Sequence, residues 1–192
     1  MQGKTHAAVG VAAALILSPS SNIPMTVSGA CIAAVGALMP DTDTEKSLGS
    51  GIARKAFVQT LIVFGLVEAG LFSDASLTFT ASQLAGPLAL LGLCLFASTQ
   101  PHRGIMHSIP MMVLATLLAR FINEAFMIPF LIGYASHLLL DLLNHKGEQL
   151  LWPMRKRYCL GVCSAGGVVD NALLVTALVC VAVVVVRRLG GV

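Results

Sequence analysis

Apolar stretches separated by short polar ones recur along the whole chain, and each is long enough to form a helix. The last of them, VVDNALLVTALVCVAVVVVRR, is the clearest membrane-spanning helix. The first two and the fourth are short, since a helix of about 15 residues measures only about 23 Å against a hydrocarbon core of about 30 Å. The first two are therefore either short helices or a half-inserted hairpin. The pattern predicts seven helices, at about residues 7–19, 25–39, 54–72, 83–98, 105–122, 125–143 and 168–187.

The composition supports a membrane protein. Of the 192 residues, 56% are hydrophobic and only 11% are charged, and the mean hydropathy is +0.85, values that soluble domains of this size rarely combine. We predict an all-α, polytopic transmembrane helix bundle that forms one membrane domain over residues 1–192, with its last helix at 168–188. The five cysteines do not indicate a disulfide framework, because three of them lie inside apolar stretches. A net charge of +3 favours proximity to anionic lipid over binding to nucleic acid.

The basic residues are unevenly divided between the two sides of a seven-helix arrangement. The side that does not hold the N-terminus has only Arg120, Arg187 and Arg188. The N-terminal side has nine, namely Lys4, Lys46, Arg54, Lys55, Arg103, Lys146, Arg155, Lys156 and Arg157. The positive-inside rule then places the N-terminal side in the cytoplasm. All five histidines fall at helix ends on this same side: His6, His102, His107, His137 and His145.

The stretch YASHLLLDLLNHKG places His137, Asp141 and His145 at four-residue intervals in an apolar helix. Residues four apart share one helix face, so a His/Asp pair at this spacing can chelate one cation. The alternative is a buried histidine that only hydrogen-bonds a neighbouring helix. Ionisable side chains are costly in lipid, which favours the metal-binding interpretation.

The stretch PHRGIMHS places His102 and His107 around Arg103 and Gly104. The planar guanidinium of Arg103 is suited to binding phosphate, and the glycine permits a tight turn. Alternatively, Arg103 only fixes the topology at a helix end.

The stretch LMPDTDTEKS places Asp41 and Asp43 just after a short helix, spaced like carboxylates that bind or bridge metals. Acidic turns between helices are also common without any ligand. His6, close to the start of the first helix, is a further candidate ligand.

These motifs, in this order and spacing, resemble the YdjM-like (DUF457) family of bacterial inner-membrane, LexA-regulated, metal-dependent hydrolases. The resemblance covers about residues 1–170 and implies a YdjM-like core over 1–167. It implies a His/Asp cluster that holds a divalent metal, two zinc ions or else manganese. The implied ligands are His6, Asp41, Asp43, His107, His137 and Asp141, with His102, His145 and Asp170 as second-tier metal or substrate ligands.

The sequence departs from the family pattern at three points, which leaves the number of ions open. Thr44 stands where the acidic turn of the family usually has a histidine. Asn144 and His145 replace a usual Thr-Pro, and Asp170 stands in for a glutamate at the start of the last helix.

We therefore expect a membrane-embedded hydrolase in which metal-activated water cleaves a phosphoester or ester, above all in a phospholipid or lysophospholipid of the cytoplasmic leaflet. Arg103 would stabilise developing charge, His102 would transfer protons, and Lys4 and Lys46 would attract headgroups. We expect a multi-pass protein of the bacterial inner membrane with its active site on the cytoplasmic side. Membrane lipid would be both its solvent and its substrate. We expect no nucleic acid and no obligate protein partner. The alternatives are a non-catalytic metal-binding or metal-transporting protein, and a bundle whose polar residues only join helices.

Overall fold

The computed structural model describes residues 1–17, 27–43, 81–97 and 99–190 and is all-helical over them. Three short 3-10 helices accompany the α-helices: η1 (Pro40–Asp43), η2 (Ile105–His107) and η3 (Glu124–Phe126). The α-helices are α1 (Gly3–Leu17), α2 (Val27–Leu38), α4 (Ala81–Ala97), α5 (Ile109–Ile122), α6 (Met127–Leu142) and α7 (Val168–Gly190).

Six of the seven predicted apolar helices are present, and the seventh, 54–72, lies outside the described residues. Only two described helices are long and apolar enough to cross a membrane, at Glu124–Leu142 and Val168–Arg187. The all-α prediction is confirmed for the described residues, whereas seven complete crossings are not.

The helix predicted at 105–122 begins later than the apolar pattern suggested. Residues 105–107 form a 3-10 turn, and α5 starts at Ile109. The side chain of Ser108 accepts a hydrogen bond from the backbone N–H of Met111 at 3.3 Å, and Pro110 fits the first turn because it has no N–H to donate. This local chemistry separates the HRGIMH turn from the helix that follows it.

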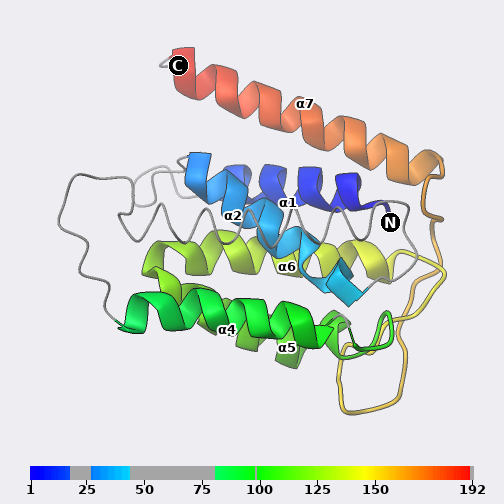
Figure 1. Ribbon diagram of the computed structural model, residues 1–192. Coiled ribbons are helices and arrows are strands. Elements are labelled where there is room, and N and C mark those ends of the chain that lie inside the picture. The colour runs from blue at the N-terminus through cyan, green and yellow to red at the C-terminus, as the bar shows by residue number, and fades with distance from the viewer. Residues whose placement is uncertain (18–26, 44–80, 98, 191–192) are drawn as a thin grey trace.

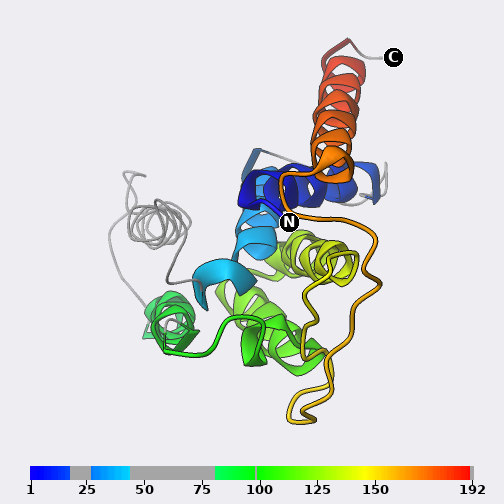
Figure 2. The ribbon, with the colours of Figure 1, turned by 90° about the vertical axis from the view of Figure 1, so that its right-hand side faces the viewer.

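The helices lie side by side with the site at one end (Figure 1). Helix α6 packs against α1, α2 and α5, while α4 packs on α5. Helix α7 packs on α1 and lies at the edge of the bundle, as the view along the bundle shows (Figure 2). The N-terminus, the end of α6 and the start of α7 meet at the same end, so residues far apart in sequence converge there (Figure 1).

Small residues let α2 and α6 approach each other closely. A Cβ atom at Gly133 would overlap the backbone carbonyl of Ala33, and one at Gly36 would overlap that of Phe130. Such small-residue contacts are typical of helix pairs in membranes. The close approach also brings the backbone of Ala37 within reach of α6, which matters for the site.

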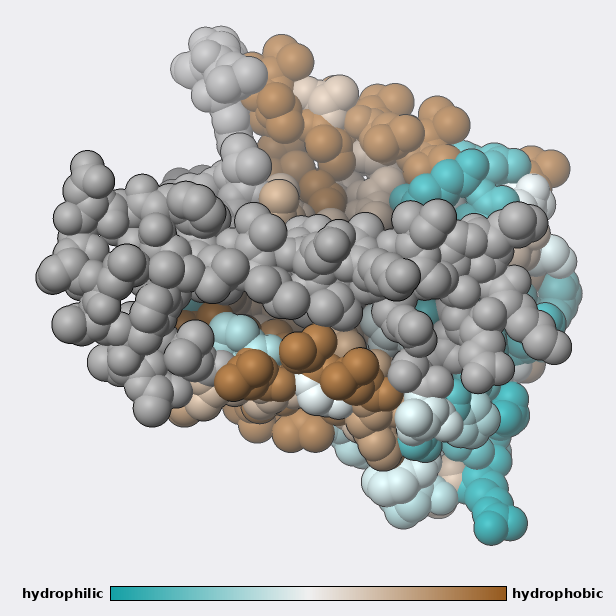
Figure 3. All heavy atoms as spheres, in the orientation of Figure 1, coloured by the Kyte–Doolittle hydropathy of each residue, from teal (hydrophilic) through white to brown (hydrophobic). Residues whose placement is uncertain are grey.

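Hydrophobic and hydrophilic residues are separated on the surface (Figure 3). Apolar side chains cover α7 and much of the visible bundle, whereas hydrophilic ones gather at the end where the N-terminus and the 144–167 loop lie (Figure 3). An apolar flank with one polar end is the surface expected of a protein whose solvent is largely lipid.

Candidate metal centre

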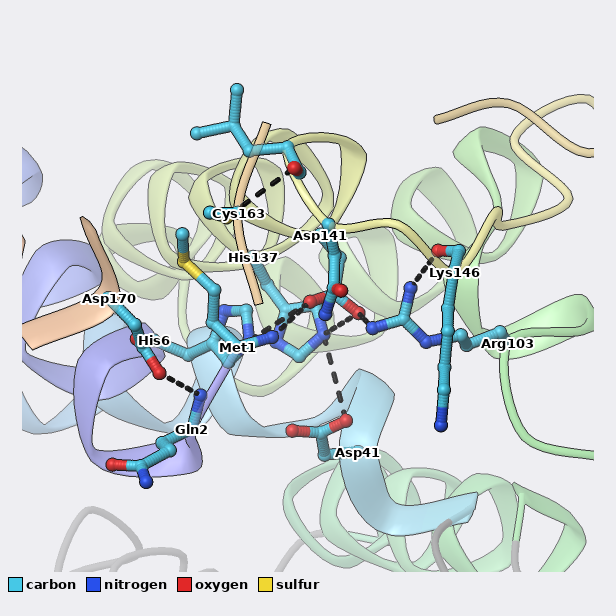
Figure 4. Close-up of polar contacts among 12 residues, drawn as sticks. Met1, Gln2, His6, Asp41, Arg103, His137, Asp141, Lys146, Cys163 and Asp170 are labelled. Atoms are coloured by element: carbon cyan, nitrogen blue, oxygen red, sulfur yellow. Dashed lines mark hydrogen bonds and ion pairs between the residues drawn. The ribbon is translucent and has the colours of Figure 1, made fainter. Parts of the chain in front are cut away.

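Five ligand-type side chains from four elements meet at the polar end of the bundle, and Figure 4 labels four of them, His6, Asp41, His137 and Asp141. The first turns of α1 contribute one histidine, η1 an aspartate, η2 a histidine, and the last turns of α6 a histidine and an aspartate. The residues are His6, Asp41, His107, His137 and Asp141.

The orientation of His137 is fixed by a hydrogen bond to the backbone. Its Nδ1 lies 2.7 Å from the carbonyl oxygen of Ala37. Because a carbonyl only accepts, Nδ1 must carry the proton, and Nε2 keeps its lone pair. Nε2 then faces the Oδ1 of Asp41 at 3.8 Å and the Oδ2 of Asp141 at 3.9 Å. Metal-binding histidines are usually held in this manner.

His107 is held by the turn before α5. The hydroxyl of Tyr134 donates to the carbonyl of Met106 at 2.5 Å, which ties this turn to α6. The Nε2 of His107 lies 3.3 Å from that of His137 and 3.7 Å from the Oδ1 of Asp41. Two imidazole nitrogens facing each other this closely fit a shared proton or cation between them.

His6 is buried against the ring face of His137. The two rings stack with centroids 3.8 Å apart. The Nε2 of His6 lies 3.3 Å from the Oδ1 of Asp141, and neither ring nitrogen has a hydrogen-bond partner among the described residues. A fully buried imidazole with no hydrogen bond is costly unless a cation uses its lone pair.

The five side chains form two overlapping groups, His6–His137–Asp141 and Asp41–His107–His137, each with one ligand atom per residue within 4.8 Å of the others. The Oδ1 of Asp141 faces His6, whereas its Oδ2 faces His107 and His137. Asp141 would therefore offer a ligand atom on either side of the cluster. His137 would offer only one, its Nε2, because its Nδ1 is engaged by the carbonyl of Ala37.

Arg103 closes the cluster on the side of the loop after α6. Its Nη2 lies 2.6 Å from the Oδ2 of Asp141, and its Nη1 donates to the carbonyl of Lys146. The side chain is buried, and its backbone takes a left-handed conformation with φ of 62°. A non-glycine residue in this region is strained, and such strain concentrates at functional sites. The N-terminal amine of Met1 also contacts Asp141, at 2.7 Å from Oδ1.

Charge in the site favours an ionised Asp41. Burial alone would raise the pKa of this carboxyl, but His137 and His107 beside it lower the pKa well below its usual range. Asp41 thus offers a carboxylate, the form that a metal requires.

The remaining predicted site residues lie outside these two groups. His102 is exposed, with its ring edge-on to His107 at 5.2 Å between centroids. Lys4 is exposed on α1. Asp170 is buried at the start of α7, where it accepts from the backbone N–H groups of Gln2 at 3.2 Å and Gly166 at 2.6 Å. The side chain of Asp43, and all of Lys46 and Thr44, lie outside the described residues.

The prediction that His145 shares the helix face of His137 and Asp141 is wrong. Helix α6 ends at Leu142, and the carbonyls of Leu142 and Leu143 accept hydrogen bonds from the returning backbone at 160–163. The chain turns away at this point, which leaves His145 exposed beside Gly161.

Sequence reasoning missed two contributors to the site, and it did not predict the burial of a nearby glutamate. The carbonyl of Ala37 and the hydroxyl of Tyr134 act through backbone contacts that no motif announces. Glu148 belongs to a polar loop in the sequence, yet it is fully buried in the structure.

Comparison with known proteins identifies the family of this chain. The family profile described as YdjM inner membrane protein matches residues 1–190. The inner membrane proteins YdjM of Escherichia coli (strain K12) and of Shigella flexneri are each 34% identical over 104 residues, covering 46% of this chain and 52% of the relative. The matching region thus spans about half the length of these relatives. No solved structure matches. The profile match over nearly the whole chain shows that the protein belongs to the YdjM family of inner membrane proteins.

Proposed function

We propose that this protein is a membrane-embedded, metal-dependent hydrolase. The observation that carries the proposal is the convergence of three histidines and two aspartates from four elements, α1, η1, η2 and α6, with ligand atoms within 4.8 Å in each group. A cluster of this kind is hard to explain as helix-joining polarity alone, because the polar contact of the buried His6 ring is to Asp141, itself a member of the cluster, and its Nδ1 has no hydrogen-bond partner among the described residues.

The donor set fits a divalent transition metal, zinc in the first place and manganese as the alternative. Neutral imidazole and carboxylate are the ligands that zinc accepts, and five such side chains exceed what one tetrahedral ion needs. Asp141 would offer one carboxylate oxygen on the side of His6 and the other on the side of His107. When bound, such ions supply water activated for attack near neutral pH and polarise the bond to be cleaved.

The neighbouring residues can bind the substrate and transfer a proton. Arg103 has an Nε without a hydrogen-bond partner in the described structure, so its guanidinium can still donate to a phosphoryl or carbonyl oxygen. His102 is exposed beside His107, where a ring nitrogen can protonate the leaving oxygen. Asp141 holds Arg103 in place through the contact at 2.6 Å.

The position of the centre supports a lipid substrate, a phospholipid or lysophospholipid. The elements that carry the centre, the start of α1 and the end of α6, lie at the end of the bundle where hydrophilic side chains gather beside the apolar flank (Figures 1 and 3). A lipid headgroup could reach it there while the acyl chains stay in the bilayer. The exposed Lys4 and the exposed run Arg155–Arg157 would attract anionic headgroups. The excess of basic residues on this side favours the cytoplasmic leaflet.

The test is hydrolysis by the purified protein in vesicles loaded with zinc or manganese. Phospholipids and lysophospholipids labelled separately in headgroup and acyl chain would reveal which bond is cut. We expect product release that disappears with chelator and with His107→Ala. Metal binding without turnover of any lipid or soluble phosphoester would instead indicate a non-catalytic metal-binding or metal-transporting protein.

A further inference from the structure

We propose that Glu148 is an additional metal ligand, a third carboxylate of the centre. This inference rests on the metal centre of the proposed function. It concerns the loop after α6, which contributes none of the five side chains described above.

The backbone of Glu148 is fixed beside Arg103. Its N–H donates to the carbonyl of Tyr158 at 3.0 Å, and its carbonyl accepts from Tyr158 at 2.9 Å. Two residues that flank Glu148 in the sequence bind Arg103. The carbonyl of Lys146 accepts a hydrogen bond from the guanidinium, and the N–H of Gln149 donates to the backbone carbonyl of Arg103 at 3.3 Å. The segment 146–149 therefore wraps around the arginine that contacts Asp141.

The side chain of Glu148 is buried without a hydrogen-bond partner. Its exposed fraction is 0%, and neither carboxyl oxygen is hydrogen-bonded within the described part of the chain. Buried carboxyl groups are normally paired, because both the charged and the neutral form need partners. A cation that binds the free oxygens would supply the missing partner.

Glu148 also lies within electrostatic reach of the centre. Burial raises the pKa of this carboxyl to about 8, as expected without a compensating cation, and the charges of His107, Asp141 and Arg103 also act on it. These three include two residues of the cluster and the arginine that closes it.

The charge balance of the centre agrees with an ion at this position. Asp41, Asp141 and Glu148 bring three carboxylates, while Arg103 is a permanently charged basic side chain in contact with Asp141. Counting the Met1 amine as well still leaves an excess of negative charge once Glu148 is ionised. A divalent cation would neutralise that excess, and its binding would favour the ionised form of Glu148.

The test is titration of the chelator-stripped, detergent-solubilised protein with zinc and with manganese by calorimetry. The variants are Glu148→Gln, which keeps the shape of the side chain, and Glu148→Asp, which keeps its charge. Glu124→Gln is the matched control, because Glu124 is an exposed carboxylate at the other end of α6, paired with Arg120. Thermal unfolding of the stripped proteins checks that each variant is folded.

We expect Glu148→Gln to lose one ion or to bind at least about 10-fold more weakly, with Glu148→Asp in between and Glu124→Gln unchanged. Wild-type affinity and stoichiometry in a folded Glu148→Gln protein would overturn the inference and leave the proposed function standing. An absence of metal binding by the wild-type protein would overturn both.

Discussion

The two described segments of spanning length are α7 and α6 together with the preceding η3, and they use their apolar residues in opposite ways. About half of the α6 span is buried inside the protein, against 11% of the α7 span. Helix α6 carries buried His137 and Asp141, whereas the middle of α7 exposes residues such as Leu178 and Val179. Polar groups are thus placed on the helix that other helices enclose, which is where their cost in lipid is lowest.

Close packing around α6 should be the most sensitive feature. We expect Gly133→Val to cost about 3 kcal/mol or more, because its side chain would overlap the carbonyl of Ala33. The matched control is Gly92→Val on α4, whose Cβ would meet no atom within 4 Å among the residues compared. Thermal unfolding in detergent measures both. Equal stability of the two variants would contradict the packing described for α2 and α6.

The buried ion pair at the end of α6 should be nearly as sensitive. We expect Asp141→Asn to cost about 3–5 kcal/mol in chelator-treated protein, because it leaves the buried Arg103 without its carboxylate. The exposed pair Arg120–Glu124 offers the comparison, and Glu124→Gln should leave the unfolding midpoint almost unchanged. If both substitutions have the same small effect, Arg103 and Asp141 are solvated and the site is not closed.

The hydroxyl of Tyr134 should have an intermediate effect. Tyr134→Phe removes the bond to the carbonyl of Met106, at an expected cost of about 1–2 kcal/mol. Metal affinity should fall with it, since this bond holds the turn that carries His107. Tyr158→Phe is the control, because Tyr158 lies in the loop and its ring contacts Lys156. Unchanged metal affinity in Tyr134→Phe would show that the turn is positioned without this bond.

The lipid-facing surface of α7 should be the least sensitive. We expect Leu178→Ala to change the free energy of unfolding by no more than about 0.5 kcal/mol in detergent, since the side chain is 54% exposed. Leu138→Ala on α6, where the side chain is 4% exposed, should cost about 2–5 kcal/mol. A large loss in Leu178→Ala would indicate that a partner covers α7.

The apolar pattern predicted the helices well because hydrophobicity over a dozen or more residues is a strong local signal. It also predicted that the histidines lie at one end of the bundle. Successive helices run in opposite directions, so the order of the helices determines which helix ends lie together. The prediction failed for His145, because the helix ends three residues earlier, where loop N–H groups bind the last carbonyls. Contacts of this kind join residues distant in sequence, and a single chain read alone does not reveal them.

Within the site, spacing revealed the pair His137 and Asp141, because both lie on one helix. The tautomer of His137 depends on the carbonyl of Ala37, and that contact exists only because glycines let α2 approach α6. Glu148 gave no signal in the sequence, where it is one charged residue in a polar loop. Its burial follows from the pairing of its backbone with Tyr158.

The most direct test of the central claim is elemental analysis of the purified, detergent-solubilised protein beside the double variant His137→Ala/Asp141→Ala. The site predicts about two zinc or manganese ions per chain in the wild-type protein, because its five ligand-type side chains exceed what one tetrahedral ion needs. The double variant should retain none. A folded wild-type protein without stoichiometric metal, even after reloading with zinc or manganese, would contradict the account.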